Sequence, residues 1–452
     1  MSERQIYPAS RACCGGDTLC MAKDGEGKCL IVSGGGEAYE TLIGAPLALP
    51  EGAAKRCPLS NRNAALLREL LPFTRPSRHK GKPFTIGLGD RLGIASPGHL
   101  RLLAHKNADA FPVLAQQSAR ELTLTGRTNE DVLAAAVWAV FQEGWRGGYG
   151  ADGDHLKTPE EVQNVIDCGY TMVTLDCSAH IRNDRGEDPE AIYGEAVAFA
   201  ADIYHKYLRG KDIDFELSID ETAAPTTPEA HLYVANKLRR AGVELVTLAP
   251  RFCGEFQKGI DYIGDLADFE EDFKRHACIA REGGYKLSIH SGSDKLSVFP
   301  IIFRHTGGNA HLKTAGTSWL EALRVVAEVN PELFRSVVLF ALANLAEAKQ
   351  YYHTTENTAN IPDIDTLPDS ALPGLLCQND SRQALHISYG SVLSAKDPGG
   401  AALYKDALYA ALNANEDKYY AALYSRISLH LPPRARADAA AGQLSAAGFR
   451  QP

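Results

Sequence analysis

Histidines next to acidic or small polar residues recur where short apolar segments of this sequence end. His290 follows Lys286-Leu-Ser-Ile289, which has the composition of a short buried strand, and precedes Ser-Gly-Ser-Asp-Lys. His155 directly follows Asp154. A neutral imidazole is a good ligand for a divalent cation, and a neighbouring carboxylate can accept a proton. One such histidine alone is more often structural, but the recurrence favours a metal-dependent active site.

A regular alternation of strands and helices would position these residues. Eight candidate strands lie between residues 84 and 314, and helical patterns separate most of them; the strands begin near Phe84, Phe111, Gly148, Tyr170, Asp214, Val243, Lys286 and Ala310. This alternation indicates parallel strands with crossover helices, and its length fits a (β/α)8 TIM-type barrel. A doubly wound sheet is the alternative, but the glycines of residues 87–93 do not match the Gly-x-Gly-x-x-Gly spacing.

In such a barrel, the residues that follow each strand face the active site. We expect a ring of polar side chains there, from Asp90, Gln116, Asp154, His155, Asp176, Asp220, Glu221, Arg251, His290 and Lys313. Adjacent strand residues point to opposite faces, so Asp154 and His155 can serve one site only where their strand bends. Gly150 and Gly153 make such a bend feasible.

Three histidines of the predicted strands suit one divalent metal ion. His155, His290 and His311 would supply nitrogen ligands to Zn, Mn, Co or Ni and leave positions open for a substrate. His311 lies early in its strand, so His386 is the alternative third ligand. After the His311 strand, Thr317 or Ser318 is expected to cap a helix that begins at Trp319.

A candidate general acid follows the sixth strand. Glu255 lies between two aromatic residues within the glycine-containing segment 251–259, which suggests a positioned and partly desolvated acid. A solvated loop carboxylate is the alternative interpretation. Arg251 and Lys313 could anchor a substrate carboxylate, and Gln116 and Asp176 complete the predicted substrate-binding set.

The barrel is expected to occupy residues 81–330, between an N-terminal cap segment (1–80) and a helical C-terminal extension (331–452). The ten cysteines lack the paired spacing of a zinc site, and the chain shows no secretion signal, so we expect reduced thiols. A net charge of −9 without a basic block argues against nucleic acid or an anionic membrane as partner. We therefore expect a cytoplasmic protein that acts on a small molecule. The sequence does not decide its oligomeric state, and a homo-oligomer is one of the options.

Four segments resemble the tagaturonate epimerase family, which includes tagatose 4-epimerases; they span residues 150–158, 251–259, 288–295 and 313–323. The resemblance extends from about residue 80 to 390. It implies a divalent-metal-dependent epimerase that interconverts D-tagaturonate and D-fructuronate, or the neutral ketohexoses tagatose and fructose. It further implies that Asp154 is the proton acceptor, Glu255 the proton donor, and His155 and His290 metal ligands.

The two sugar acids differ at a carbinol carbon β to the ketone, which simple enolisation cannot invert. Retro-aldol cleavage and re-addition, with a metal as Lewis acid, is one route. Direct removal and return of the C–H proton by Asp154 and Glu255 is the other. A class II-type aldolase would need nearly the same residues, and a non-catalytic sugar-binding barrel is the alternative from another class of protein.

Overall fold

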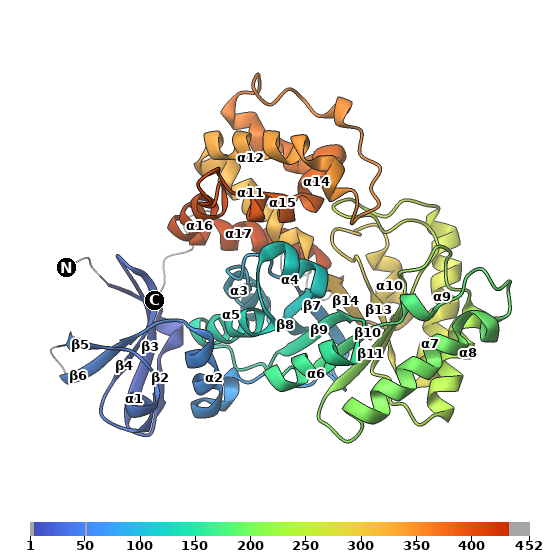
Figure 1. Cartoon of the computed structure of the whole chain (residues 1–452), viewed down its shortest axis with the longest axis horizontal. Helices are drawn as coiled ribbons and strands as arrows, with labels where there is room; N and C mark the ends of the chain where they lie inside the picture. Colours follow the sequence, from blue (N-terminus) through green and yellow to red (C-terminus); the bar gives the residue numbers. More distant parts are fainter. Residues whose placement is uncertain (1–3, 50–51, 434–452) are drawn as a thin grey trace.

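The protein consists of a barrel, an N-terminal sheet and a group of C-terminal helices (Figure 1). The computed structural model describes residues 4–49 and 52–433, so the final part of the expected C-terminal extension lies outside the described residues. The N-terminal sheet lies at one side of the barrel, and the C-terminal helices lie above the barrel in this view. Within the described residues, no helix is long and apolar enough to cross a membrane.

Eight parallel strands close the barrel, as the sequence predicts. They are β7 (Phe84–Leu88), β8 (Phe111–Ser118), β9 (Gly150–Leu156), β10 (Met172–Asp176), β11 (Asp214–Ile219), β12 (Thr247–Pro250), β13 (Lys286–Ile289) and β14 (Ala310–Thr314). The ring closes where β14 pairs with β7, with Ala310 opposite Phe84. Nearly every strand residue is buried, because helices cover the outside of the barrel and side chains fill its interior.

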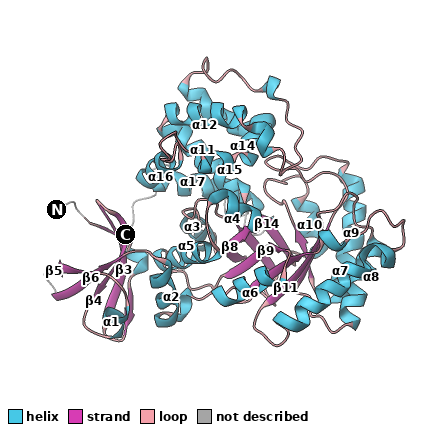
Figure 2. Cartoon of the chain, viewed as in Figure 1, coloured by secondary structure: helices cyan, strands magenta, loops and turns pink. Residues whose placement is uncertain are grey.

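Helices follow the strands and enclose the barrel (Figure 2). They are α3 (Ser96–His105), α4 (Ala119–Thr125), α5 (Asn129–Gln142), α6 (Pro159–Cys168), α7 (Pro189–Ile203), α8 (Pro228–Arg240), α9 (Leu266–Gly283), α10 (Phe299–Thr306) and α11 (Gly316–Val329). Local signals set their ends: Thr158 caps α6 in a capping box with Glu161, and Gly169 ends it in the left-handed conformation.

Helix α11 begins earlier than the sequence suggests. Its first residue is Gly316, and no side chain caps it. Thr317 and Ser318, the expected caps, lie inside the helix because their hydroxyl groups have other partners. The Thr317 hydroxyl donates to Asp294, and the Ser318 hydroxyl bonds with the His99 ring.

The N-terminal segment forms a six-stranded sheet. Its strands are β1 (Gln5–Ile6), β2 (Ala12–Cys14), β3 (Asp17–Asp24), β4 (Gly27–Ser33), β5 (Ala45–Leu49) and β6 (Gly52–Cys57), accompanied by α1 (Glu37–Thr41) and α2 (Asn61–Leu70). The sheet and α2 share an apolar cluster with α5, in which Leu30 and Leu67 pack with Val137 and Phe141. This contact fixes the sheet to the outside of the barrel. All ten cysteines are free thiols.

The C-terminal helices form a second apolar core with α11. They are α12 (Pro331–Ala343), α13 (Leu345–Ala348), α14 (Asn379–Ile387), α15 (Tyr389–Ser394), α16 (Lys405–Ala414) and α17 (Glu416–Ile427). Trp319 and Leu323 of α11 pack with Phe334 of α12 and Tyr389 of α15. Because α11 directly follows the last barrel strand, this core joins the extension to the barrel and brings α14 close to the carboxyl ends of the strands.

Candidate active site

A cavity of about 520 Å³ opens at the carboxyl ends of the barrel strands. It collects all but one of the predicted catalytic, substrate-binding and metal-ligating residues; its lining includes Gln116, Asp154, His155, Asp176, Arg251, Glu255, His290 and Lys313, together with Asp220 and His386. His311 is the predicted residue that does not line it. The location agrees with the general position of active sites in barrels of this type.

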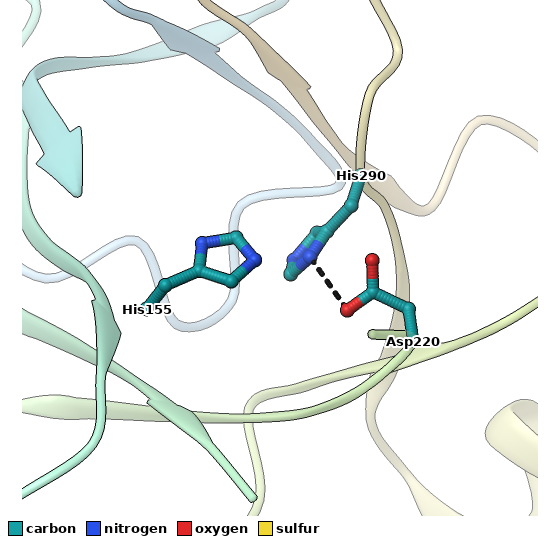
Figure 3. Close-up of side chains that lie close together, drawn as sticks. All are labelled: His155, Asp220 and His290. Atoms are coloured by element: carbon teal, nitrogen blue, oxygen red, sulfur yellow. Dashed lines mark ion pairs between the residues drawn. The ribbon is translucent and has the colours of Figure 1, made fainter. Parts of the chain in front are cut away.

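His155, Asp220 and His290 form a compact group that could hold a metal ion (Figure 3). One ligand atom from each residue lies within 4.8 Å of the others. His290 Nδ1 is 3.1 Å from Asp220 Oδ1, and the centroids of the two imidazole rings are 4.7 Å apart. His155 belongs to β9, while Asp220 and His290 directly follow β11 and β13. Two nitrogens and one oxygen suit the divalent ions expected from the sequence.

Each histidine of this group is oriented by a second carboxylate. His290 Nε2 lies 2.8 Å from Glu216 Oε1, and His155 Nδ1 lies 2.8 Å from Asp154 Oδ1. If each ring donates a proton to its carboxylate, His290 Nδ1 and His155 Nε2 keep a lone pair for a cation. Such carboxylate–histidine pairs fix ring orientation and tautomer in metal sites. The chemistry of the donor set therefore fits a divalent metal.

The negative charges around His290 also favour a bound cation. Burial by itself lowers the pKa of the His290 imidazole, but Asp220 and Glu216 outweigh burial and raise this pKa to about 10. The carboxylates thus favour positive charge at the place where the ligand atoms meet.

A local irregularity of β9 lets Asp154 and His155 serve the same site. His155 has a φ of 54°, in the left-handed region that non-glycine residues seldom adopt. The register between β9 and β10 shifts near the same residues, between Val173 and Leu175. The chain therefore bends at the end of the strand, as expected from Gly150 and Gly153, and the two side chains meet instead of pointing to opposite faces.

Lys313 lies at the centre of a buried polar network that crosses the barrel interior. Its ammonium group is 2.6 Å from Asp152, 2.8 Å from Asp154, 2.9 Å from Glu216 and 2.6 Å from the Thr174 hydroxyl. These partners occupy its hydrogen-bonding capacity, so the structure places Lys313 as a counter-ion of carboxylates rather than as a free anchor for a substrate. Burial alone raises the pKa of Asp154, but Lys313 and His155 together hold it well below its usual range.

Four residues of the metal-ligand group and of the network around Lys313 are not among the catalytic, substrate-binding and metal-ligating residues predicted from the sequence. They are Asp220, Glu216, Asp152 and Thr174. Asp220 appeared only in the ring of polar residues expected at strand ends. Glu216 and Thr174 lie inside strands, where alternating polar residues signal only that one face of the strand is not apolar. Which of them meet depends on the register between strands.

The two candidates for the third metal ligand lie elsewhere. His311 is fully buried near the start of β14, where Nδ1 lies 2.7 Å from the Thr85 hydroxyl and the ring stacks on His79. The structure does not bring it to His155 and His290, because a residue early in a strand lies deep in the barrel. His386, on α14, lines the cavity but is not part of the group of possible ligands.

The remaining predicted residues surround the cavity. Gln116 is buried on β8, and its Oε1 atom has no hydrogen-bond partner in the described part of the chain. Asp176 accepts from the Ser178 amide at 2.8 Å and faces the Lys157 ammonium at 3.0 Å. The Arg251 guanidinium donates to the Thr222 carbonyl. Polar groups therefore face the cavity from several strands.

Glu255 is half-buried in the loop after β12, where its backbone pairs with Ile263 in an isolated bridge. Lys295 stabilises this loop through hydrogen bonds to backbone carbonyls. Its buried ammonium group donates to the carbonyls of Gln257 and Ile260, at 2.7 and 2.6 Å, and to the carbonyl of Ser293 at 3.2 Å. The neighbouring Asp294 binds Arg382. These bonds tie the Glu255 loop to the loop that carries His290.

A closed parallel barrel with paired carboxylates and histidines at the carboxyl ends of its strands defines the class of (β/α)8-barrel enzymes acting on small polar molecules. Comparison with known proteins identifies the family within this class. The family model of tagaturonate epimerase (UxaE) matches residues 7–191 and 187–433. The chain belongs to the tagaturonate epimerase family and is an epimerase, an enzyme of the isomerase class.

Individual relatives agree with this assignment. The tagaturonate/fructuronate epimerase of Thermotoga maritima is 40% identical over 457 residues, which cover 91% of this chain and 93% of the relative. The native crystal structure of the fructuronate-tagaturonate epimerase of Cohnella laeviribosi superposes with a TM-score of 0.92 at 43% identity, covering 95% of this chain and 96% of the other. A glycerol complex of the same protein gives the same TM-score and identity, with coverages of 94% and 96%. The family resemblance seen in the sequence is confirmed.

Proposed function

We propose that this epimerase interconverts D-tagaturonate and D-fructuronate with a divalent cation held by His155, Asp220 and His290. The names of the relatives from Thermotoga maritima and Cohnella laeviribosi support the substrate. The observation that carries the metal is the group of three ligands within 4.8 Å, two of them backed by carboxylates. A neutral ketohexose is the alternative substrate class.

When bound, the cation supplies a Lewis acid for the ketone and its neighbouring oxygen atoms. Zn, Mn, Co and Ni all accept this combination of imidazole and carboxylate ligands. Glu216 and Asp154 hold the two imidazole rings in place through their 2.8 Å contacts.

Other residues of the cavity are assigned to proton transfer and substrate binding. We assign Asp154 as the proton acceptor, because its carboxylate is kept ionised beside Lys313 and faces the cavity. Glu255, in the loop on another side of the lining, is the proton donor. Gln116, Asp176 and Arg251 bind the substrate, and Lys313 positions Asp154 instead of contacting the substrate carboxylate.

Two reaction routes to the epimer are compatible with these residues. In the retro-aldol route, Asp154 takes the hydroxyl proton, the O–H electrons form an aldehyde, and the C–C bond electrons pass to the ketone fragment. The aldehyde then rotates, the C–C bond re-forms on its other face, and a proton returns to the new hydroxyl group. In the other route, Asp154 removes the C–H proton and Glu255 returns one from the opposite face. Both routes need an acid and a base on different sides of the substrate.

Turnover of D-fructuronate by the purified protein tests the proposal, before and after EDTA and after separate addition of Zn, Mn, Co and Ni. We expect epimer formation that EDTA abolishes and one or more of these metals restores. Full activity in protein that metal analysis shows to be metal-free would contradict the metal assignment. Release of free three-carbon fragments would indicate an aldolase, and D-fructose tested in parallel would reveal a preference for neutral sugars.

A further inference from the structure

The same cavity has a second polar region, around His386, that takes no part in the proposed proton transfers or metal binding. His386 lines the cavity with only 1% of its surface exposed, and neither ring nitrogen has a hydrogen-bond partner among the described residues. A buried imidazole without partners is costly unless a ligand satisfies it. Burial and the nearby cations Arg91 and Lys258 keep the pKa of His386 well below its usual range. The ring is therefore neutral and has one N–H group to donate.

The start of α11 adjoins this histidine. Ala315 and Gly316 line the cavity, no side chain caps the helix, and the amides of residues 316–318 have no acceptor within residues 4–49 and 52–433. A Cβ atom at position 316 would overlap with Nε2 of His386, so the ring reaches the helix end only because this residue is glycine. The free amides and partial positive charge of a helix N-terminus favour an anion.

Lys258 adds a full positive charge to the region. Its ammonium group donates to the Ser291 hydroxyl at 2.7 Å, and among the described residues it forms no ion pair, although the charges of Glu221 and Glu121 act on it from further away. Three other cations of the cavity differ in this respect: Lys313 contacts three carboxylates, Lys157 faces Asp176, and Arg91 binds Glu121. Arg120 and Arg251 resemble Lys258, because in the part of the chain that the structure describes each donates to a backbone carbonyl and forms no ion pair. Lys258 thus has donor capacity left for a ligand.

The cavity therefore contains two electrostatically different regions. The strongest charges acting on His386 are cations, whereas Asp154 and Asp220 are prominent among those acting on His155. A ketose acid has the matching polarity: its ketone and hydroxyl oxygens suit a metal ion, and its carboxylate terminates the other end of the carbon chain. Charge-assisted hydrogen bonds from an ammonium group and backbone amides are the usual means of binding such a group.

We propose that Lys258, His386 and the amides at the start of α11 form the subsite that binds the carboxylate of the substrate. This inference rests on the proposed function. It explains why the cavity would bind a uronate more tightly than a neutral ketohexose, which has no carboxylate. It differs from the expectation that Arg251 or Lys313 anchors the carboxylate. Lys313 is already matched by carboxylates, whereas Arg251 has donors left beside its bond to the Thr222 carbonyl and is therefore the competing anchor.

The test uses the metal-loaded full chain and two inhibitors that differ only at one terminus, D-gluconate and D-glucitol. Lys258→Met should raise KM for D-fructuronate and the inhibition constant of gluconate about 10- to 100-fold, the effect of one lost charge-assisted hydrogen bond. The inhibition constant of glucitol should change less than about 2-fold, since it has no charge to lose. His386→Leu should show the same selectivity, and Lys258→Arg should restore much of the binding of gluconate.

Two variants serve as comparisons. Lys80→Met removes an exposed lysine that pairs with Glu244, outside the active-site cavity, and should change neither inhibition constant. Arg251→Met tests the competing anchor. Selective loss of gluconate binding in Arg251→Met but not in Lys258→Met overturns the proposal, and so does an equal change for gluconate and glucitol in both Lys258→Met and His386→Leu.

Failure of the proposed function is a separate result. If the wild-type protein forms no epimer from D-fructuronate, that function fails, and calorimetric titration of gluconate and glucitol still measures the subsite in the same variants. A wild-type preference for gluconate that disappears in Lys258→Met supports the subsite, whereas equal affinities in the wild type overturn it.

Discussion

His155 and Asp154 are consecutive residues of β9, yet His155 Nδ1 lies 2.8 Å from Asp154 Oδ1. In a regular strand these side chains would point to opposite faces. They meet because His155 adopts a φ of 54°, a conformation that costs a non-glycine residue free energy unless its surroundings hold it. The bond to Asp154 and the neighbouring His290 ring are part of those surroundings. One strained residue thus joins the proposed base to a proposed metal ligand.

Replacement of Asp154 should therefore affect both chemistry and metal binding. We expect Asp154→Asn to lower kcat by about 10²- to 10⁴-fold, the usual contribution of a general base. Metal affinity should fall about 10- to 100-fold, as is typical when a carboxylate behind a ligating histidine is lost. Steady-state kinetics at saturating metal and a competitive chelator titration measure the two effects. Asp212→Asn, at an exposed residue that pairs with Arg78, is the control. Unchanged kcat at saturating metal would exclude Asp154 as the base.

The third metal ligand can be decided by comparing two substitutions. Asp220→Asn should remove most of the bound metal at equal free metal concentration, because it replaces an anionic ligand that lies 3.1 Å from His290 Nδ1. His311→Asn should leave the metal content unchanged and lower the free energy of unfolding by about 1–3 kcal/mol, through loss of buried hydrogen bonding to Thr85. Elemental analysis and urea unfolding give both values. Metal loss in His311→Asn with full occupancy in Asp220→Asn would reverse the assignment.

The barrel was predictable because its signals are local. Alternating strand and helix patterns, the Thr158 cap and Gly169 at the end of α6 are all properties of neighbouring residues. The positions of His155 and His290 at strand ends were predictable for the same reason, since the carboxyl ends of parallel strands meet at one face.

The interior network was not predictable, because it depends on contacts between strands that do not follow one another in the chain. Lys313 of β14 meets Asp152 of β9 and Glu216 of β11 across the barrel, and only the register of the closed ring brings these residues together. The same limit applies to His311: its residue type and its place in a predicted strand suggested a ligand, whereas the structure places it deep in the barrel, away from His155 and His290.

Lys295 should matter more for stability than its distance from the metal ligands suggests. Lys295→Met would leave the carbonyls of Gln257, Ile260 and Ser293 without their buried donor. Each unsatisfied buried acceptor costs about 1–3 kcal/mol, so the free energy of unfolding should fall by at least about 3 kcal/mol. Urea unfolding measures this loss, and Lys274→Met on the exposed surface of α9 provides the control. A loss no larger than that of the control would show that the three carbonyls do not depend on Lys295.

Stability should also fall in mild acid, because the fold buries neutral histidines. His99 is fully buried, with Nε2 3.0 Å from the Ser318 hydroxyl, and burial lowers its pKa to about 4. In the unfolded chain its pKa is about 6.5, so between these values the unfolded state binds more protons than the folded state. The contribution of neutral His99 is complete above pH 6.5 and is lost as the pH falls toward 4. Between pH 7 and 5 it should amount to about 2 kcal/mol.

A His99→Asn variant isolates this contribution, since asparagine can bond with Ser318 but does not titrate in this range. Urea unfolding of both proteins at pH 7, 6 and 5 should show the stability advantage of the wild type shrinking by about 2 kcal/mol. The metal-free form of both proteins should be used, so that release of the cation in acid does not add to the slope. An advantage that stays constant across this range would mean that the pKa of His99 is the same in both states, and one that grows toward pH 5 would mean that folding raises this pKa.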